Sequence, residues 1–378
     1  MSGQVVYTGK QQQIRQWILE SIKSGQIAPG DKLPSESELC QRHAASRGSV
    51  RQAITALVNE GWLSSRKGVG TYCVMKDRRL TMDIGLICFH SASYIFPRIS
   101  QGCDRIAHRR GFHILLNQSE YDLGKEREIL TKLRKRGVDG IIIEPIFDGE
   151  GPSNVGLLEE MEAEGIPVVL LDNHFPGKGF STIAMDDAMG GTIVASHLWE
   201  RGHRRIGIVY GGGYLPKRLR KEGAAGFLKE HGAPVRDEWM IPCATPLVSG
   251  NTVARLEGFL RGTGASPAEA RGPAGADRPT AVICTSDEEA MELYRAAEAL
   301  GMRIPAELSV ISFDNSSLAE LPGISLSSVD HPGQYMGELA TEVLLEKVLN
   351  PGIASRTTSL IRPRLVERSS VADQQPKS

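Results

Sequence analysis

Seven short apolar segments alternate with helical segments over most of the chain, and this alternation limits the fold more than any other feature. The segments are DIGLICF (83–89), HILLNQ (113–118), GIIIEP (140–145), PVVLLD (167–172), RIGIVYG (205–211), AVICTS (281–286) and LSVISFD (308–314). Stretches with helical periodicity, such as 125–137 and 288–301, separate them. The alternation predicts a doubly wound α/β fold, a parallel sheet with helices on both faces. Seven such units exceed one comfortable sheet, so we expect two lobes.

The first 75 residues have a different pattern. Ile14, Trp17, Ile18 and Ile22 form one apolar stripe of a helix over 10–24. A capping box of Ser35 and Glu38 predicts the start of a second helix. A third helix is expected in 46–61, with Ser46 as its N-cap and Gly61 as its end. The segment 62–74 then predicts two short strands around a basic turn at 66–70. Three helices and a two-stranded wing predict a winged helix-turn-helix.

The exposed side of the third helix suits a DNA groove. Helical projection turns Gly48, Ser49, Gln52, Thr55 and Asn59 away from the apolar face, with Arg47 and Arg51 beside them. Arginine suits guanine edges or phosphates, and glutamine suits adenine. The first 80 residues contain 12 Lys and Arg against 6 Asp and Glu, whereas the formal net charge of the whole chain is −1. We therefore expect the basic front end to meet a polyanion.

The front end resembles the winged helix-turn-helix domain of GntR-type bacterial regulators. The resemblance rests on Leu33-Pro34-Ser35-Glu36, Ser46-Arg47, Val50-Arg51-Gln52-Ala53, Leu57, Glu60-Gly61 and Gly68-x-Gly70-Thr71. It implies DNA contacts at ten positions of the second and third helices and the wing. These positions are Ser35, Glu36, Arg47, Ser49, Arg51, Gln52, Arg66, Lys67, Gly68 and Gly70. Gly48 stands where the family commonly has Thr.

Polar side chains follow the strands of the back end. Among them are Tyr94, Asp172, Tyr214, Asp287 and Asp314. Ligands of doubly wound sheets bind beyond the carboxyl ends of the strands. Carboxylates, amides and an arginine can each hold neighbouring hydroxyls, and an aromatic ring offers a flat face to C–H groups. This equipment predicts a site for a polyol or sugar.

Residues 83 to about 349 resemble the effector domain of LacI/GalR-type, periplasmic-binding-protein-like repressors. The matching residues include Gly137-Val138-Asp139-Gly140, Arg201-Gly202-His203-Arg204-Arg205-Ile206 and Phe313-Asp314-Asn315. The resemblance implies effector contacts at Ser91, Ser93, Tyr94, Phe96, Asp186 or Asp187, Arg220, Asp287, Asp314 and His331. Ala224 and Ser286 replace the Phe and Asn of the family. A GntR-like headpiece on a LacI-like body is similar to arabinose-responsive repressors and favours a pentose; other monosaccharides and nucleosides remain alternatives.

Other classes of protein fit the sequence less well. We find no G-x-S-x-G elbow, no phosphate-binding P-loop, no H-E-x-x-H and no complete dinucleotide fingerprint, so we expect no enzyme and no cofactor. The six cysteines form no C-x-x-C pair, so no metal site is expected. A solute-binding protein on the same two-lobed fold would need an export signal and would have no use for the first 75 residues. The apolar runs are far too short for a membrane span, and we expect a cytoplasmic protein.

The domain organisation follows from these patterns. We expect a DNA-binding domain at 1–75, a charged linker at 76–82, a two-lobed effector domain at 83–367 and a disordered tail at 368–378. The predicted function is that of a ligand-responsive transcription regulator. It would bind double-stranded operator DNA as a homodimer and respond to a sugar-like effector. Effector-relieved repression is expected, with corepression and activation as alternatives.

Overall fold

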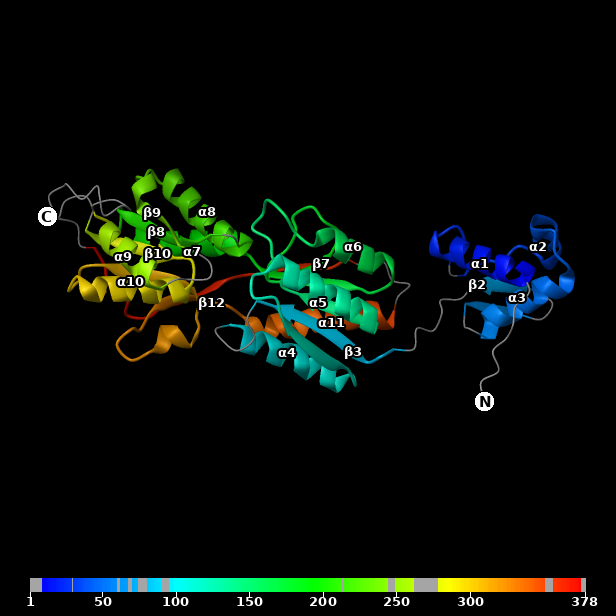
Figure 1. Cartoon of the computed structure of the whole chain (residues 1–378). Coiled ribbons are helices and arrows are strands. Elements are labelled where there is room, and N and C mark those ends of the chain that lie inside the picture. Colours follow the sequence, from blue (N-terminus) through cyan, green and yellow to red (C-terminus); the bar gives the residue numbers. More distant parts are fainter. Residues whose placement is uncertain are drawn as a thin grey trace. The chain divides into compact units, whose positions relative to one another are not determined.

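The computed structural model describes residues 9–28, 30–59, 62–66, 70–73, 80–89, 95–212, 214–243, 249–261, 278–350 and 356–374. The chain divides into two compact units, Met1–Leu80 and Thr81–Ser378 (Figure 1). No helix in these ranges is both long and apolar enough to cross a bilayer.

The first unit contains three helices and a two-stranded antiparallel ribbon. Its elements are α1 (Gly9–Lys23), α2 (Glu36–His43), α3 (Arg47–Asn59), β1 (Leu63–Arg66) and β2 (Gly70–Cys73). The predicted apolar stripes form its core, where Ile14 and Ile18 of α1 and Val50 and Leu57 of α3 are fully buried. Lys32 adds a single bridge to Tyr72, at the edge of the ribbon. The predicted winged helix-turn-helix is therefore confirmed.

Serine side chains begin two of these helices, as their spacing predicts. The Ser35 hydroxyl accepts a hydrogen bond from the Glu38 amide, and the Glu38 carboxylate accepts one from the Ser35 amide, which completes the capping box. The Ser46 hydroxyl accepts a hydrogen bond from the Ser49 amide at 3.2 Å at the start of α3. The predicted helix end at Gly61 lies outside the described residues.

The second unit has two lobes, each built on a six-stranded sheet. The N-terminal lobe has the strand order β13-β7-β6-β5-β3-β4 and is parallel throughout. Its strands are β3 (Asp83–Cys88), β4 (His113–Gln118), β5 (Gly140–Ile143), β6 (Val168–Leu171), β7 (Ser181–Met185) and β13 (Thr358–Ile361). The helices α5 (Leu123–Arg136) and α6 (Val155–Ala163) cover one face, and α4 (Phe96–Arg109) and α11 (Gly333–Leu349) cover the other (Figure 1).

The C-terminal lobe repeats this architecture. Its sheet has the order β14-β12-β11-β10-β8-β9, and the edge strand β14 alone runs antiparallel to its neighbour. The strands are β8 (Ile206–Gly211), β9 (Met240–Cys243), β10 (Ala281–Cys284), β11 (Ser309–Asp314), β12 (Ser327–Asp330) and β14 (Arg364–Val366). The helices α7 (Asp187–Glu200) and α8 (Leu215–Glu230) pack on one face; α9 (Ser249–Leu260) and α10 (Asp287–Ala299) pack on the other. Short 3-10 turns, η1 (Asp237–Trp239) and η3 (Ser317–Glu320), complete it.

The chain passes between the two lobes at three places. It crosses from β7 to α7, from β12 to α11 and from β13 to β14. The first crossing contains Asp186 and the second contains His331. Because the strand ends of both sheets lie near these crossings, polar residues distant in sequence face one another between the lobes. The predicted two-lobed doubly wound fold is confirmed.

The predicted disordered tail at 368–378 is wrong for residues 368–374. The Ser370 side chain is buried; its hydroxyl accepts from the Ser327 amide at 2.8 Å and donates to the Val310 carbonyl at 2.6 Å. Further along, the Gln374 amide donates to the Arg201 carbonyl at 2.8 Å. Polar composition suggested disorder, but backbone and hydroxyl groups of the tail complete hydrogen bonds of the C-terminal lobe.

Candidate DNA-binding and effector-binding sites

The predicted DNA-contacting residues of α2 and α3 gather on one surface of the first unit. Arg47, Arg51 and Gln52 are exposed, as the helical projection predicts. Ser35 and Ser49 lie in the first turns or caps of α2 and α3, where the Ser49 hydroxyl lies 3.0 Å from that of Ser46. The start of a helix favours anions, so the starts of α2 and α3 are suited to meet phosphate oxygens.

Glu36 and Arg51 form an ion pair within this surface. The Arg51 Nε donates to Glu36 Oε2 at 2.9 Å and to Oε1 at 3.1 Å. The Arg51 side chain nevertheless remains 68% exposed. Because the carboxylate holds the Nε edge, the terminal nitrogens of the guanidinium stay available to an external acceptor. The pair explains why an acidic residue lies on a surface suited to DNA.

The wing is described in part. Gly70 pairs with Arg66 across the ribbon, and its φ of +139° is one that side chains rarely adopt. A Cβ at this position would also lie 2.5 Å from Lys32 Cε, but that side chain is flexible; the backbone conformation is the reason that the wing needs glycine here. The Arg66 side chain, Lys67 and Gly68 lie outside what the structure describes.

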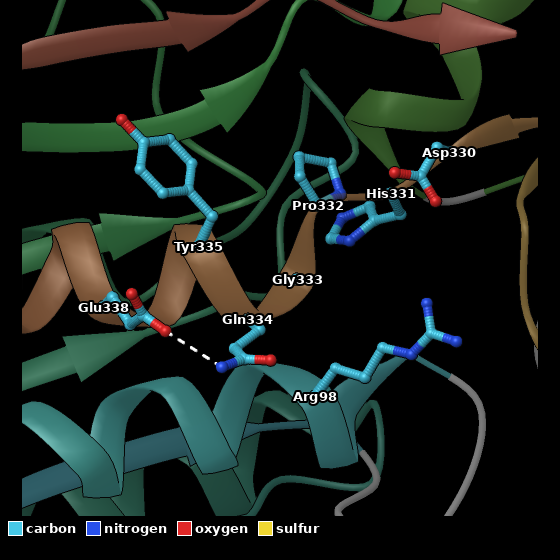
Figure 2. A pocket seen from close by; sticks show the side chains of 8 residues that line it. All are labelled: Arg98, Asp330, His331, Pro332, Gly333, Gln334, Tyr335 and Glu338. Atoms are coloured by element: carbon cyan, nitrogen blue, oxygen red, sulfur yellow. Dashed lines mark hydrogen bonds between the residues drawn. The ribbon is translucent and has the colours of Figure 1, made fainter.

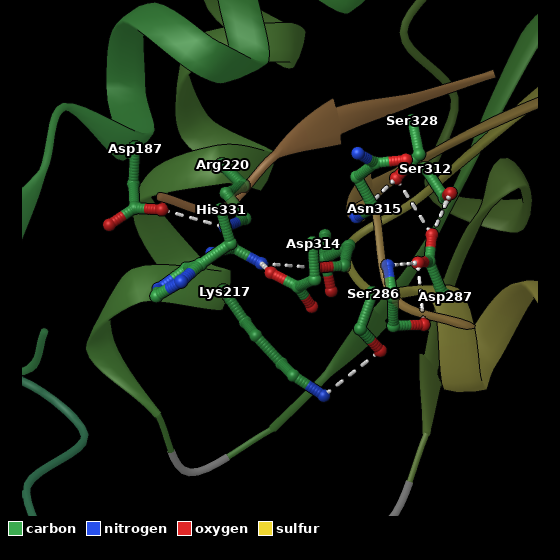
Figure 3. Close-up of polar contacts among 12 residues, drawn as sticks. Asp187, Lys217, Arg220, Ser286, Asp287, Ser312, Asp314, Asn315, Ser328 and His331 are labelled. Carbon is green, nitrogen blue, oxygen red and sulfur yellow. Dashed lines mark hydrogen bonds and ion pairs between the residues drawn. The ribbon is translucent and has the colours of Figure 1, made fainter. Parts of the chain in front are cut away.

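Arg220 is the centre of a buried charge network in the second unit (Figure 3). Its Nε donates to Asp187 Oδ1 at 2.7 Å, and its Nη1 donates to Asp314 Oδ1 at 2.8 Å and to the Thr285 carbonyl at 2.9 Å. All three charged side chains are at most 3% exposed. The structure thus brings together three of the predicted effector-contacting residues, which come from α7, α8 and β11.

Close helix packing sets this geometry. A Cβ on Gly191 of α7 would lie 2.1 Å from the Arg220 carbonyl oxygen, and one on Gly223 of α8 would lie 2.0 Å from that of Ala188. Only glycine lets the two backbones approach this closely. The approach places Arg220 within hydrogen-bond distance of Asp187. The neighbouring Asp186 instead caps α7 by accepting from the Met189 amide at 3.0 Å.

A second set of contacts joins the two lobes. The Tyr214 hydroxyl, at the N-cap of α8, donates to Asp172 Oδ2 at 2.8 Å and also bonds Glu144. Asp172 and Glu144 directly follow β6 and β5 of the N-terminal lobe. His331, at the crossing into α11, brings its Nε2 within 3.2 Å of Asp172 Oδ1. Both lobes therefore contribute to one polar cluster, which we call the inter-lobe cluster: Glu144, Asp172, Asp187, Tyr214, Arg220, Asp314 and His331.

Burial and neighbouring charges shift the protonation of this cluster. Burial raises the pKa of Glu144 to about 8, and the charge of Asp172 adds to the effect. Burial likewise raises the pKa of Asp187 to about 7, although Arg220 opposes this. Burial would raise the pKa of Asp172 too, but the charges of His331 and Arg220 lower it to about 2. Asp172 in turn raises the pKa of His331 against the effect of burial. Burial therefore favours the protonated form of Glu144, whereas the charges of His331 and Arg220 favour the ionised form of Asp172.

His331 also borders an open hollow of about 370 Å³ (Figure 2). Arg98 of α4 and residues 330–335 and 338 line it. The Nδ1 of His331 is buried and has no hydrogen-bond partner within the described ranges. A buried polar atom without a partner is uncommon in native structures, so this nitrogen is available to a ligand group.

Asp287 has a different environment. Its Oδ1 accepts from the Ser328 hydroxyl at 2.8 Å and also bonds Ser312, and its Oδ2 accepts from the Ser316 amide at 2.7 Å and hydroxyl at 2.9 Å (Figure 3). These bonds tie α10 to β11, β12 and the turn after β11. The structure therefore does not bring Asp287 into the inter-lobe cluster through any of these bonds.

Of the remaining predicted effector residues, the structure describes only Phe96. Phe96 is buried as the first residue of α4, whereas Ser91, Ser93 and Tyr94 lie outside the described residues. Glu144 was not predicted from the sequence, and Asp172 and Tyr214 were predicted only as polar residues at strand ends. The position of Glu144, a charged residue directly after the fully buried strand β5, was the signal that would have found it. No group of metal-binding side chains is found in the described ranges.

Family comparisons agree with this division into two units. Residues 10–73 match the model of the bacterial regulatory proteins of the gntR family. Residues 81–255 match periplasmic binding proteins and the sugar binding domain of the LacI family, and residues 195–371 match a periplasmic binding protein-like domain.

Individual relatives are transcriptional repressors. The chain is 30% identical to the arabinose metabolism transcriptional repressor of Geobacillus stearothermophilus, over 96% of this chain and 97% of the relative. It is 30% identical to the repressor PurR of Photorhabdus laumondii, over 78% of this chain and 81% of the relative. A putative ribose operon repressor from Burkholderia thailandensis has a similar structure, with 26% identity, a TM-score of 0.62 and coverage of 75% of this chain and 98% of the other. These relatives are regulators and not enzymes. The chain therefore belongs to the family of bacterial transcriptional repressors that join a gntR-type DNA-binding domain to a LacI-type, periplasmic-binding-protein-like effector domain.

Proposed function

We propose that this repressor acts in the cytoplasm as a homodimer whose inter-lobe cluster binds an uncharged sugar, with L-arabinose as the first candidate. The observation that carries the proposal is the Arg220 network, because its carboxylates and guanidinium are buried where the strand ends of both lobes meet. Its Asp187 and Asp314 can each accept from neighbouring hydroxyls, while Arg220 can donate to a ring or hydroxyl oxygen. The arabinose repressors among the relatives favour the pentose.

The charges of the inter-lobe cluster favour an uncharged ligand. Asp172, Asp187 and Asp314 face one arginine and one histidine, and Glu144 adds a fourth carboxyl group. A phosphate or carboxylate on the ligand would lose its hydration on entry, and the one arginine it would meet is already held by Asp187 and Asp314. A polyol instead offers several donors to the carboxylate oxygens. We therefore expect sugar phosphates and sugar acids to bind more weakly than the parent sugar.

A purine or nucleoside is the second candidate. Phe89 and Tyr121 stack with ring centroids 4.3 Å apart, and the Phe89 ring meets the edge of the Tyr214 ring at 5.3 Å. Aromatic side chains of this kind can also hold a flat base. The PurR relatives support this candidate, although they cover less of the chain than the arabinose repressors do.

The proposed DNA contacts are Ser35, Glu36, Arg47, Ser49, Arg51, Gln52, Arg66, Lys67, Gly68 and Gly70. In this arrangement α3 enters the major groove and the wing meets the adjoining backbone. A dimer would present two such headpieces to a pseudo-palindromic operator. Effector binding would shift the relative position of the lobes, and a coupling free energy of about 1 to 3 kcal/mol would change operator affinity about 5- to 150-fold.

The effector is tested with the full-length chain in a thermal-shift screen. Arms with L-arabinose, D-xylose, D-ribose, arabinose 5-phosphate, hypoxanthine and adenosine separate the candidate classes. A ligand at about 100 times its Kd stabilises the folded state by about 2.7 kcal/mol. We expect stabilisation by a neutral pentose and none by its phosphate. A shift with hypoxanthine alone would contradict the sugar proposal.

Two adjacent aspartates supply a matched control. Asp187→Asn removes the charge that faces Arg220, whereas Asp186→Asn changes a capping residue to another good cap. Calorimetric titration should show effector binding lost in the first variant and retained in the second. Equal loss in both variants would contradict the assignment of Asp187.

DNA docking is tested on duplexes selected from the source genome. Arg51→Ala should weaken operator binding strongly and leave effector affinity unchanged. Arg42→Ala is the matched control, since the Arg42 guanidinium lies over the Trp17 ring, 4.7 Å from its centroid, and is not a proposed contact. Operator affinity should also fall steeply with salt, because phosphate contacts release counterions. An affinity independent of salt would contradict the docking.

A further inference from the structure

A buried glutamine interrupts the apolar stripe of α1. Ile14, Ile18 and Ser21 face the core, and Gln11 shares this face at 8% exposure. The neighbouring Gln12 and Gln13 are exposed. A buried side-chain amide must find hydrogen-bond partners or destabilise the fold. Gln11 therefore needs hydrogen-bond partners within the first unit.

One partner is a residue of the DNA-facing surface. The Gln11 Nε2 donates to the Oε1 of Gln52 on α3. The Gln52 side chain is itself exposed, beside Arg51. The amide of Gln11 thus links the core to the side chain of Gln52, which the proposed docking places in the major groove.

We propose that Gln11 is a positioning residue that fixes the orientation of the Gln52 amide and thereby selects the base that Gln52 reads. The inference rests on the proposed docking of α3 in the major groove. Gln11 touches no base in this arrangement; it acts only through Gln52. With Oε1 held by Gln11, the Nε2 group of Gln52 is the part of the amide that faces the DNA.

The fixed orientation changes the expected base. A free glutamine reads adenine through both amide atoms, because Nε2 donates to N7 while Oε1 accepts from N6. Here Oε1 is already engaged, so Gln52 acts mainly as a donor. Guanine presents two acceptors, O6 and N7, in the major groove. Gln52 therefore favours guanine over adenine at its base pair, in contrast to the preference that the residue type alone suggests.

The test uses the full-length chain and selection from a duplex library with a randomised centre. Wild type is compared with Gln52→Ala, Gln11→Met, Gln11→Glu and Gln12→Glu at pH 8, where an introduced carboxylate is ionised. Gln52→Ala identifies the base pair that Gln52 reads. Gln11→Met has nearly the same shape but cannot donate, so the Gln52 amide is free to turn. The carboxylate of the Gln11→Glu variant can only accept hydrogen bonds, so it attracts the Nε2 group of Gln52 and turns the Oε1 of Gln52 toward the DNA.

We expect wild type to prefer guanine over adenine at this base pair by about fivefold or more, the size of a good direct contact. Gln11→Met should lose the preference, and Gln11→Glu should reverse it toward adenine. Gln12→Glu adds the same charge on the exposed face and should keep the wild-type preference. Thermal unfolding checks that each variant is folded. If Gln11→Glu does not fold, the loss of the guanine preference in Gln11→Met is the deciding result.

Three results would overturn the inference. These are a wild-type preference that persists in Gln11→Met, an equal loss of preference in Gln12→Glu, and a Gln52→Ala variant whose affinity falls by the same factor for every sequence. The last result would mean that Gln52 contacts only phosphate. Failure of the wild-type chain to select any sequence would instead contradict the docking itself.

Discussion

Replacement of Arg220 by methionine should destabilise the second unit and abolish its response to effector. The guanidinium makes hydrogen bonds to Asp187, Asp314 and the Thr285 carbonyl, with all three charged side chains almost completely buried. Methionine has a similar volume but no charge and no donors. The substitution therefore leaves two buried carboxylates without their counter-ion.

The size of the effect follows from this burial. Removal of one partner from a buried ion pair costs about 3 to 5 kcal/mol, because the remaining charge stays desolvated. For a unit of this size, each kcal/mol lowers the Tm by about 2 °C, so the expected fall is about 6 to 10 °C. The loss should be larger at pH 8 than at pH 5.5. Burial raises the pKa of Asp187 to about 7 even beside Arg220, so folding of the variant favours protonated Asp187 and stability decreases as pH rises through this pKa.

Scanning calorimetry of the full-length chain measures this fall. The triple variant Arg220→Met, Asp187→Asn, Asp314→Asn removes the stranded charges as well, and it should recover most of the lost stability while still failing to bind effector. This comparison separates the charge effect from a change in packing. A single variant that loses less than about 1 kcal/mol, or a triple variant no more stable than the single one, would refute the reasoning.

Three further predictions concern neighbouring groups. Tyr214→Phe removes the hydroxyl that joins the lobes, so denaturant unfolding should show a loss of about 1.5 to 3 kcal/mol, which is what a hydrogen bond to a charged group contributes to stability. An unchanged stability would contradict this role. Burial raises the pKa of Glu144 to about 8, so folding takes up a proton and the free energy of unfolding falls as pH rises from about 4.5 to 8. Glu144→Gln should remove this dependence when the free energy of unfolding is measured with denaturant over the same pH range. An unaltered pH dependence in the variant would contradict the prediction. Asp287→Ala should lower the free energy of unfolding by roughly 2 to 3 kcal/mol in denaturant, because it leaves buried serine hydroxyls without an acceptor. The affinity for effector should stay unchanged. A variant with full stability and lost affinity would instead indicate that Asp287 contacts the effector directly.

Local patterns predicted most of the architecture. The apolar stripe of Val50 and Leu57 and the capping box at Ser35 depend on residues three or four apart, so the sequence shows them directly. The buried strands were visible as short apolar runs for the same reason. The tail is the exception, since polar residues such as Ser370 are held by hydrogen bonds to β11 and β12, which composition does not reveal.

The residue types of the site could also be read from the sequence, because polar side chains at strand ends mark the ligand edge of a doubly wound sheet. Their partners could not. Arg220 and Asp314 are 94 residues apart, Tyr214 and Glu144 are 70 apart, and Gln11 and Gln52 are 41 apart. Helical and strand periodicity extends over only a few residues, whereas these pairs depend on where the chain crosses between lobes and how closely its helices pack. Tertiary structure alone therefore decided that Asp187 faces Arg220 while Asp186 caps a helix, and that Asp287 supports its lobe through serine hydroxyls.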